Sequence, residues 1–193
     1  SIQVAKLFSD SGIDNIEISG GTYEQPRLLG LDKVSINPKR SESRKESTIA
    51  REAYFLSYAE EIAKVVNIPL MVTGGFRTKE GMEAALADGA CEIVGVGRPL
   101  CANPYAIKEL LAGQIDELPK YEKTLSIGPW WLSPTSPFRL IQAINAFSAQ
   151  AWFYQQIKKM GKGLMPDLNL KPWKAFREDA KADQEAIKEY QKI

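Results

Sequence analysis

The sequence predicts an α/β fold in which short parallel strands alternate with helices. Three short apolar runs lie between segments whose apolar side chains follow a helical period. These runs are apolar enough to be buried on both faces, which is typical of parallel strands joined by right-handed crossover helices. At 193 residues and 44% hydrophobic side chains, the chain is long enough to bury a core.

Capping and turn residues set the expected boundaries of these elements. Gly89 and Gly113 stand where helices should end, because glycine readily adopts the conformation that closes a helix. Thr78 and Asn103 stand where helices should begin, and Pro104 strengthens the second of these starts. The expected helices are 2–11, 49–66, Thr78 to Gly89 and Asn103 to Gly113, and the expected strands are 15–19, 70–73 and 91–97.

Two regions differ from this alternating pattern. Residues 22–47 are polar and mixed in charge, and a loop of that length in a compact domain is usually functional or mobile. The last third of the chain begins with a segment rich in Pro, Ser and Trp, followed by expected helices over 137–160 and 173–191. We therefore expect a partial α/β domain over residues 1–113, with a helical extension over 114–193 that packs against it.

Composition narrows the classes of function. The net charge of +1 argues against a large electrostatic surface for nucleic acid, and no apolar run approaches the ~18–20 residues that a membrane span needs. Two cysteines are too few for a disulfide framework or a zinc site, so we expect a reducing, cytoplasmic protein without a metal. The absence of histidine removes the commonest side chain for acid–base work near neutral pH.

Two of the predicted strands end in glycine and arginine. The second strand is followed by "GGFR" (74–77), and the third ends in "GRP" (97–99). The ends of neighbouring parallel strands share one edge of a sheet, so both turns should lie side by side. Glycine lets backbone amides approach an anion closely, and the following helix start and Arg98 add positive charge. One such turn is more often only a tight turn, but two in succession favour a phosphate site.

These turns belong to segments that resemble a known family. The segments "GIDNIEISGGTYE", "REAYFLSYAEEIAKVVNIPLMVTGGFRTKEGMEAALADGACEIVGVGRPL" and "WFYQQIKKMGKG" resemble the C-terminal half of the NADH:flavin oxidoreductase, or old yellow enzyme, family. The likeness runs through nearly all of residues 4–170. It implies an FMN-binding (βα)8 barrel that reduces activated alkenes or other acceptors with NADH or NADPH, and of which this chain supplies strands six to eight.

The resemblance also implies roles for particular residues. Gly74, Gly75, Phe76, Gly97 and Arg98 match the positions that hold the FMN phosphate, mainly through backbone amides and the guanidinium. The loop after Gly21, with Tyr23, would border the flavin and the substrate cleft. The family places its proton-donating tyrosine and its substrate-gripping pair on an earlier strand, which this sequence lacks. The catalytic residues therefore stay unassigned, and we expect no ene reduction from the isolated chain.

Three functions remain open from the sequence. The first is the FMN-binding half of an ene-reductase-type oxidoreductase that acts on a small-molecule substrate. The second is a truncated, non-redox half-barrel that associates with itself and binds or rearranges a small molecule, and the third is another phosphate-binding barrel enzyme. Half a barrel exposes strand edges and an apolar interior, so we expect either a homo-oligomer or a complementing N-terminal half-barrel chain.

Overall fold

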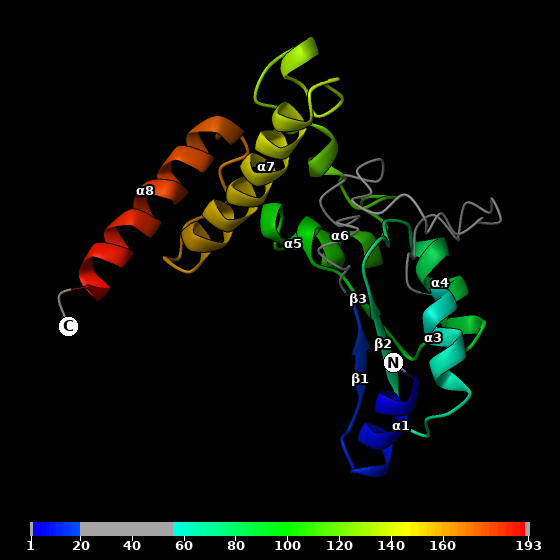
Figure 1. Ribbon diagram of the computed structural model, residues 1–193. Helices are drawn as coiled ribbons and strands as arrows, with labels where there is room; N and C mark the ends of the chain where they lie inside the picture. Colours follow the sequence, from blue (N-terminus) through cyan, green and yellow to red (C-terminus); the bar gives the residue numbers. More distant parts are fainter. Residues whose placement is uncertain (1, 20–55, 192–193) are drawn as a thin grey trace. The chain divides into compact units, whose positions relative to one another are not determined.

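A computed structural model of the chain describes residues 2–19 and 56–191 (Figure 1). These residues form two compact units. The first comprises residues 2–19, 56–100 and 105–119, and the second comprises 101–104 and 120–191. The predicted boundary between residues 113 and 114 stays a prediction. In the described ranges, no helix is both long and apolar enough to cross a membrane.

The first unit is built on a three-stranded parallel sheet with the order β1-β2-β3. Its strands are β1 (Ile16–Ile18), β2 (Leu70–Thr73) and β3 (Ile93–Gly95). Ile18 is in register with Val72, and Thr73 is in register with Gly95. All three strands therefore end at the same edge of the sheet. The predicted α/β class with parallel strands is confirmed, and all three strands lie inside their expected ranges.

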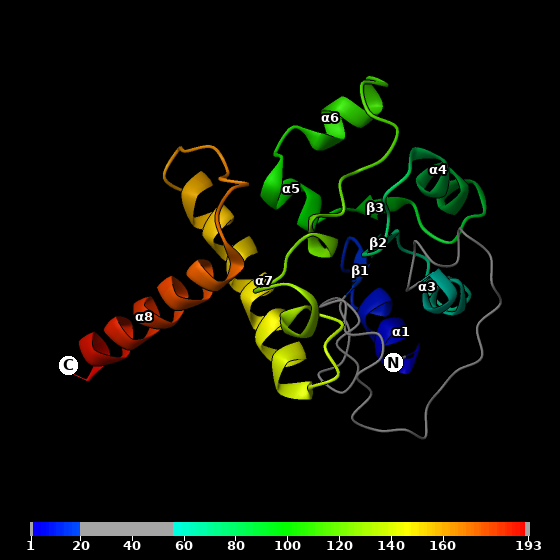
Figure 2. The same cartoon turned by 90° about the horizontal axis from the view of Figure 1, so that it is seen from above.

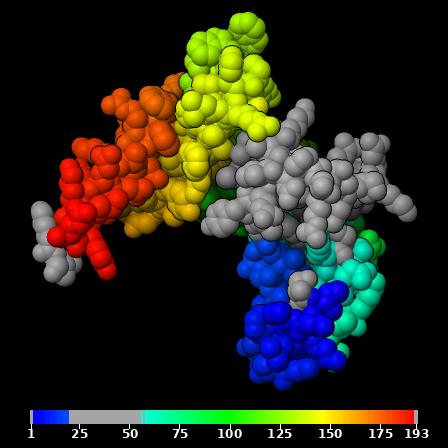
Figure 3. Space-filling view, in the orientation of Figure 1, coloured from blue at the N-terminus to red at the C-terminus, as the bar shows by residue number. Residues whose placement is uncertain are grey.

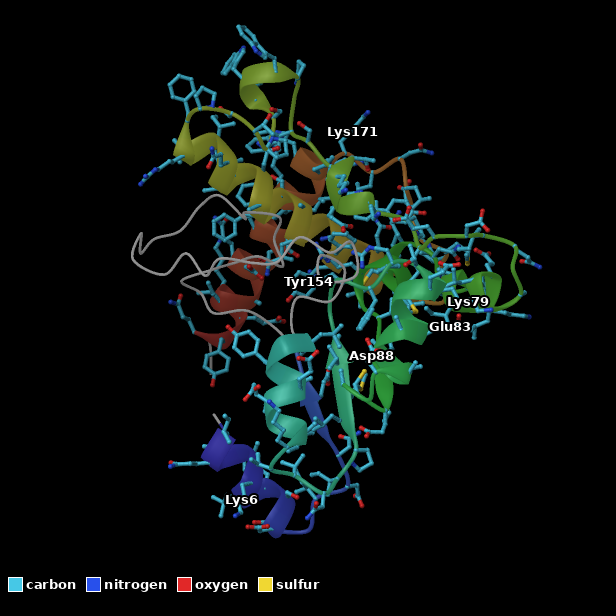
Figure 4. All side chains as sticks on the ribbon, turned by 90° about the vertical axis from the view of Figure 1, so that its right-hand side faces the viewer. Lys6, Lys79, Glu83, Asp88, Tyr154 and Lys171 are labelled. Carbon is cyan, nitrogen blue, oxygen red and sulfur yellow. The ribbon has the colours of Figure 1, made fainter. Side chains whose placement is uncertain are left out.

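Helices cover one face of this sheet. They are α1 (Ile2–Asp10), α3 (Leu56–Ala63) and α4 (Lys79–Ala87), and Figure 2 shows α3 and α4 on the same side of the strands. The opposite side of α4 faces solvent, where Lys79 and Glu83 form an ion pair at 3.6 Å (Figure 4). The core of this unit combines alternate strand residues with helix residues: Ile16, Ile18, Leu70, Val72, Val94, Ala5, Ala59, Ile62, Val66, Ala85 and Cys91.

The other face of the sheet is less covered. Successive strand residues point to opposite faces, so Glu17, Met71, Thr73 and Ile93 share this second face. Glu17 is exposed, and 40% of the Ile93 surface is accessible. The sequence predicted strands buried on both faces. Among the described residues, the face toward the helices is buried at Leu70 and Val72 and half-buried at its other strand positions.

Most helix boundaries follow the sequence signals. The Thr78 hydroxyl accepts a hydrogen bond from the Gly81 amide at 3.1 Å and caps α4, as predicted. The expected start at Asn103 is wrong, because α6 (Ala106–Leu111) begins two residues later with Tyr105 as its N-cap. An unpredicted short helix, α5 (Arg98–Ala102), precedes it, so residues 103–105 form the turn between the two helices.

The second unit is a helical pair. Its helices α7 (Arg139–Met160) and α8 (Pro172–Tyr190) lie against each other (Figure 3), and the short 3₁₀ turns η2 (Tyr121–Lys123) and η3 (Trp130–Leu132) precede them. Trp152 is the largest buried side chain of this unit, and its Nε1 donates a hydrogen bond to the Leu170 carbonyl at 2.9 Å. Both helices lie where the sequence predicted them.

A buried glutamine of α7 forms two hydrogen bonds with the connection between α7 and α8. Gln156 Oε1 accepts a hydrogen bond from the Asp167 amide at 2.7 Å, and Gln156 Nε2 donates one to the Asp167 carbonyl at 3.2 Å. The Lys159 ammonium also bonds the Asp167 carboxylate at 3.0 Å, and this hydrogen bond lowers the pKa of Asp167 below its ordinary value. The side chain of Gln156 is fully buried, so its two bonds are shielded from water.

We expect Gln156→Ala to destabilise the protein by about 1–3 kcal/mol, because it leaves the Asp167 backbone groups without their partner and opens a cavity. Gln150→Ala, on an exposed position of the same helix, is the matched control and should change stability by less than about 0.5 kcal/mol. Urea unfolding followed by circular dichroism measures both. Equal stability of the two variants would contradict this account of the connection.

Candidate functional site

The ends of β2 and β3 bring two glycine turns together. Thr73 and Gly95 are the last residues of their strands and are in register, so Gly74 and Val96 leave the sheet from neighbouring positions. Neighbouring strands lie about 4.8 Å apart, so the two turns begin side by side. The predicted placement of both turns at one edge is therefore confirmed. Their use in binding an anion stays a prediction.

The first turn has a backbone that only glycine adopts easily. The φ angles of Gly74 and Gly75 are 120° and 90°, in the region that side chains disfavour. Because glycine has no Cβ atom, other atoms at this edge of the sheet can come close to the main chain of the turn. Both glycines are half-buried, so this stretch of backbone is only partly covered by the described residues.

Phe76 and Arg77 fix the far side of this turn. Phe76 was predicted to be among the residues that hold the FMN phosphate mainly through backbone amides. Its side chain is 1% exposed and belongs to the core, so only its main chain can reach a ligand. The buried Arg77 donates from Nη1 to the Phe76 carbonyl at 2.7 Å. The Arg77 carbonyl accepts a hydrogen bond from the Leu118 amide at 2.7 Å. The turn is therefore tied to the segment after α6.

The second turn leaves open space and supplies a charge. A Cβ atom placed on Gly97 would meet nothing within 4 Å, so packing of the described residues does not require glycine here. Gly97 is exposed, so this open space faces solvent. Arg98 follows as the first residue of α5 and is half-buried, which places a permanent positive charge beside the turn.

One polar residue at this edge was not among the predicted site residues. The Thr73 hydroxyl is buried and has no hydrogen-bond partner among the described residues. The position of Thr73 in the sequence could have identified it. It is the last strand residue before Gly74, and its side chain points to the face opposite Val72. Tyr23, the other predicted cleft residue, lies outside the described residues.

The buried cysteine of this unit has no activated thiol. Burial raises the pKa of Cys91 above its ordinary value, and the nearby Glu92 carboxylate raises it further. The thiol therefore stays protonated at neutral pH, whereas a nucleophilic cysteine needs a lowered pKa. Cys91 packs in the core with Leu70 and Val72 as a small apolar residue.

Comparison with known proteins identifies the family, although no protein-family model matches the sequence. The chain is 32% identical over 165 residues to the NADH-dependent flavin oxidoreductase of Talaromyces variabilis and 40% identical over 112 residues to that of Hypocrea jecorina. It is 31% identical over 158 residues to the NADH oxidase of Thermoanaerobacter brockii. The chain belongs to the NADH:flavin oxidoreductase family.

This member of the NADH:flavin oxidoreductase family aligns over most of its own length but spans less than half the length of each of these relatives. The three alignments span 83%, 57% and 81% of this chain. They span 37%, 26% and 22% of the respective relatives. The resemblance predicted from the glycine turns and their flanking segments is therefore confirmed at the level of the family.

In this family member, Gly95 should be far less replaceable than Gly97. A Cβ atom at Gly95 would overlap the Thr73 hydroxyl and lie 2.7 Å from both Thr73 Cβ and Met71 Cε. Because the β-branched Thr73 cannot move away easily, we expect Gly95→Ala to destabilise the protein by about 1–3 kcal/mol.

Gly97→Ala is the matched control, since the added methyl group enters open space. We expect it to change the free energy of unfolding by less than about 0.5 kcal/mol. Chemical denaturation of the two variants, compared with the parent protein, measures the difference. A Gly95→Ala protein as stable as the parent would contradict the tight packing between β2 and β3.

Proposed function

We propose that this chain is the C-terminal part of a (βα)8 barrel that binds FMN in an NADH-dependent flavin oxidoreductase. In this proposal β1, β2 and β3 are the sixth, seventh and eighth strands. The observation that carries it is the register of Thr73 with Gly95, which sets the two glycine turns side by side. In (βα)8 barrels, the loops after the last two strands are the usual phosphate site.

The residues at this edge fit a phosphate ester. Gly74 and Gly75 have positive φ angles, which let their main chain approach an anion without a side chain in the way. The space beside Gly97 is open, so a ligand can lie against that turn. Arg98 would contribute a charged, two-pronged donor. Phe76 would contribute its backbone amide alone, because its side chain is in the core.

The less covered face of the sheet supports the proposal that these three strands belong to a larger barrel. Within the described residues, β1 and β3 each pair with only one neighbour, and Ile93 and Glu17 remain accessible on the second face. In a closed barrel, strands one to five would pair with both edges and bury this face. The relatives have the length for such strands, because the aligned part of the first relative is 37% of its length.

The role of this chain would be to hold and orient the cofactor. Bound FMN would supply the redox chemistry by accepting a hydride from NADH and passing it to an acceptor such as an activated alkene. NADH is favoured over NADPH because the relatives are named for it. The same names favour this function over a non-redox half-barrel and over another phosphate-binding barrel. The partner that completes the barrel would be further strands of the same protein or a complementing chain.

Arg98→Ala should weaken FMN binding about 10–100-fold, because a hydrogen bond to a charged group contributes roughly 1.5–3 kcal/mol. Riboflavin lacks the phosphate, so its affinity should stay unchanged. Arg177→Ala, at an exposed position of α8, is the control and should bind FMN as the parent does. Quenching of flavin fluorescence during titration of the full chain measures each dissociation constant. A parent protein that does not bind FMN would contradict the proposed function.

A further inference from the structure

The Thr73 hydroxyl is a buried polar group that needs a partner. The solvent-accessible surface of its Oγ1 is below 1 Å², and no described residue forms a hydrogen bond with it. Leaving a buried hydroxyl unpaired costs about 1–3 kcal/mol, and most buried polar side-chain atoms in folded proteins are paired. The Thr73 hydroxyl is therefore a candidate for contact with a ligand.

The position of Thr73 assigns that contact to the candidate site. It is the last residue of β2 and directly precedes Gly74 and Gly75. Val72 packs into the helix-covered core, so the next side chain along the strand points to the less covered face. The hydroxyl therefore lies at the edge where both glycine turns leave the sheet, on the face that the helices do not cover.

The neighbouring strand makes room for this hydroxyl. Gly95, in register with Thr73, has no side chain, and a Cβ atom there would overlap Thr73 Oγ1. The threonine side chain therefore extends over Gly95, from the end of β2 toward the end of β3. The hydroxyl therefore lies over the last residue of β3, next to the positions from which both turns leave the sheet.

We infer that Thr73 is a further phosphate-binding residue, which donates its Oγ1–H to a phosphate oxygen of the bound flavin nucleotide. This inference rests on the proposed function. The hydroxyl supplies a neutral, directed hydrogen bond from within the sheet, whereas Arg98 supplies charge from the start of α5. The bond also gives the buried oxygen the partner that it lacks among the described residues.

Substitution with valine tests the inference, because valine keeps the branched shape and removes only the hydroxyl. In the full chain, Thr73→Val should weaken FMN binding about 10–100-fold and leave riboflavin binding unchanged, as expected for a lost bond to a charged group. Thr73→Ser restores the hydroxyl and should bind FMN within about threefold of the parent. Fluorescence titration with FMN and with riboflavin measures all three proteins.

Thermal unfolding without ligand separates this role from a structural one. The valine variant should unfold at the same temperature as the parent or higher, because it replaces an unpaired buried hydroxyl with a methyl group. A lower unfolding temperature together with unchanged FMN affinity would show a structural role and overturn the inference. Equal weakening of FMN and riboflavin would also overturn it, because the contact would then not be to the phosphate.

The same titrations distinguish failure of this inference from failure of the proposed function. If the parent binds FMN, Arg98→Ala weakens that binding and Thr73→Val does not, the inference about Thr73 is wrong and the flavin site stands. If the parent binds neither FMN nor riboflavin, the proposed function is wrong and the inference falls with it.

Discussion

The parallel register between β2 and β3 is the constraint on which the candidate site depends. It sets Thr73 beside Gly95 and makes the two glycine turns neighbours. A slip of one residue would turn every side chain of a strand to the opposite face, so Thr73 would point into the helix-covered core. The close fit of Thr73 and Met71 over Gly95 adds a steric reason for this register, because no other residue type has room there.

Side-chain burial, more than strand length, maintains that register. The strands have only three or four residues, so their ladders contain few hydrogen bonds. Leu70 and Val72 are almost completely buried in the core that the sheet shares with α3 and α4, which fixes the face that β2 presents to the helices. The Arg77 carbonyl accepts a main-chain hydrogen bond from the Leu118 amide, which ties the end of the first turn to that segment, and the Arg77 side chain bonds the Phe76 carbonyl within the turn. The packing of the helices on the sheet therefore fixes the position of the candidate site.

Short-range sequence patterns predicted most of the strands and helices of this layer. The features that they did not predict depend largely on contacts between residues far apart in the sequence. β2 matches its expected range, and α4 begins after its Thr78 cap, because a short apolar run and a helix cap are local properties of the sequence. α5 was missed because five residues carry no helical period. The Thr73 hydroxyl was overlooked, because the burial of a side chain depends on which neighbouring elements cover it.

Backbone amide shifts test the central claim most directly, which is that the two turns together bind the phosphate of a flavin nucleotide. Nuclear magnetic resonance of the ¹⁵N-labelled protein, titrated with FMN and separately with riboflavin, follows the amides of Gly74, Gly75 and Gly97. The account predicts that FMN shifts all three amides strongly and that riboflavin leaves them nearly unchanged. Saturable FMN binding that leaves these amides unshifted would contradict it.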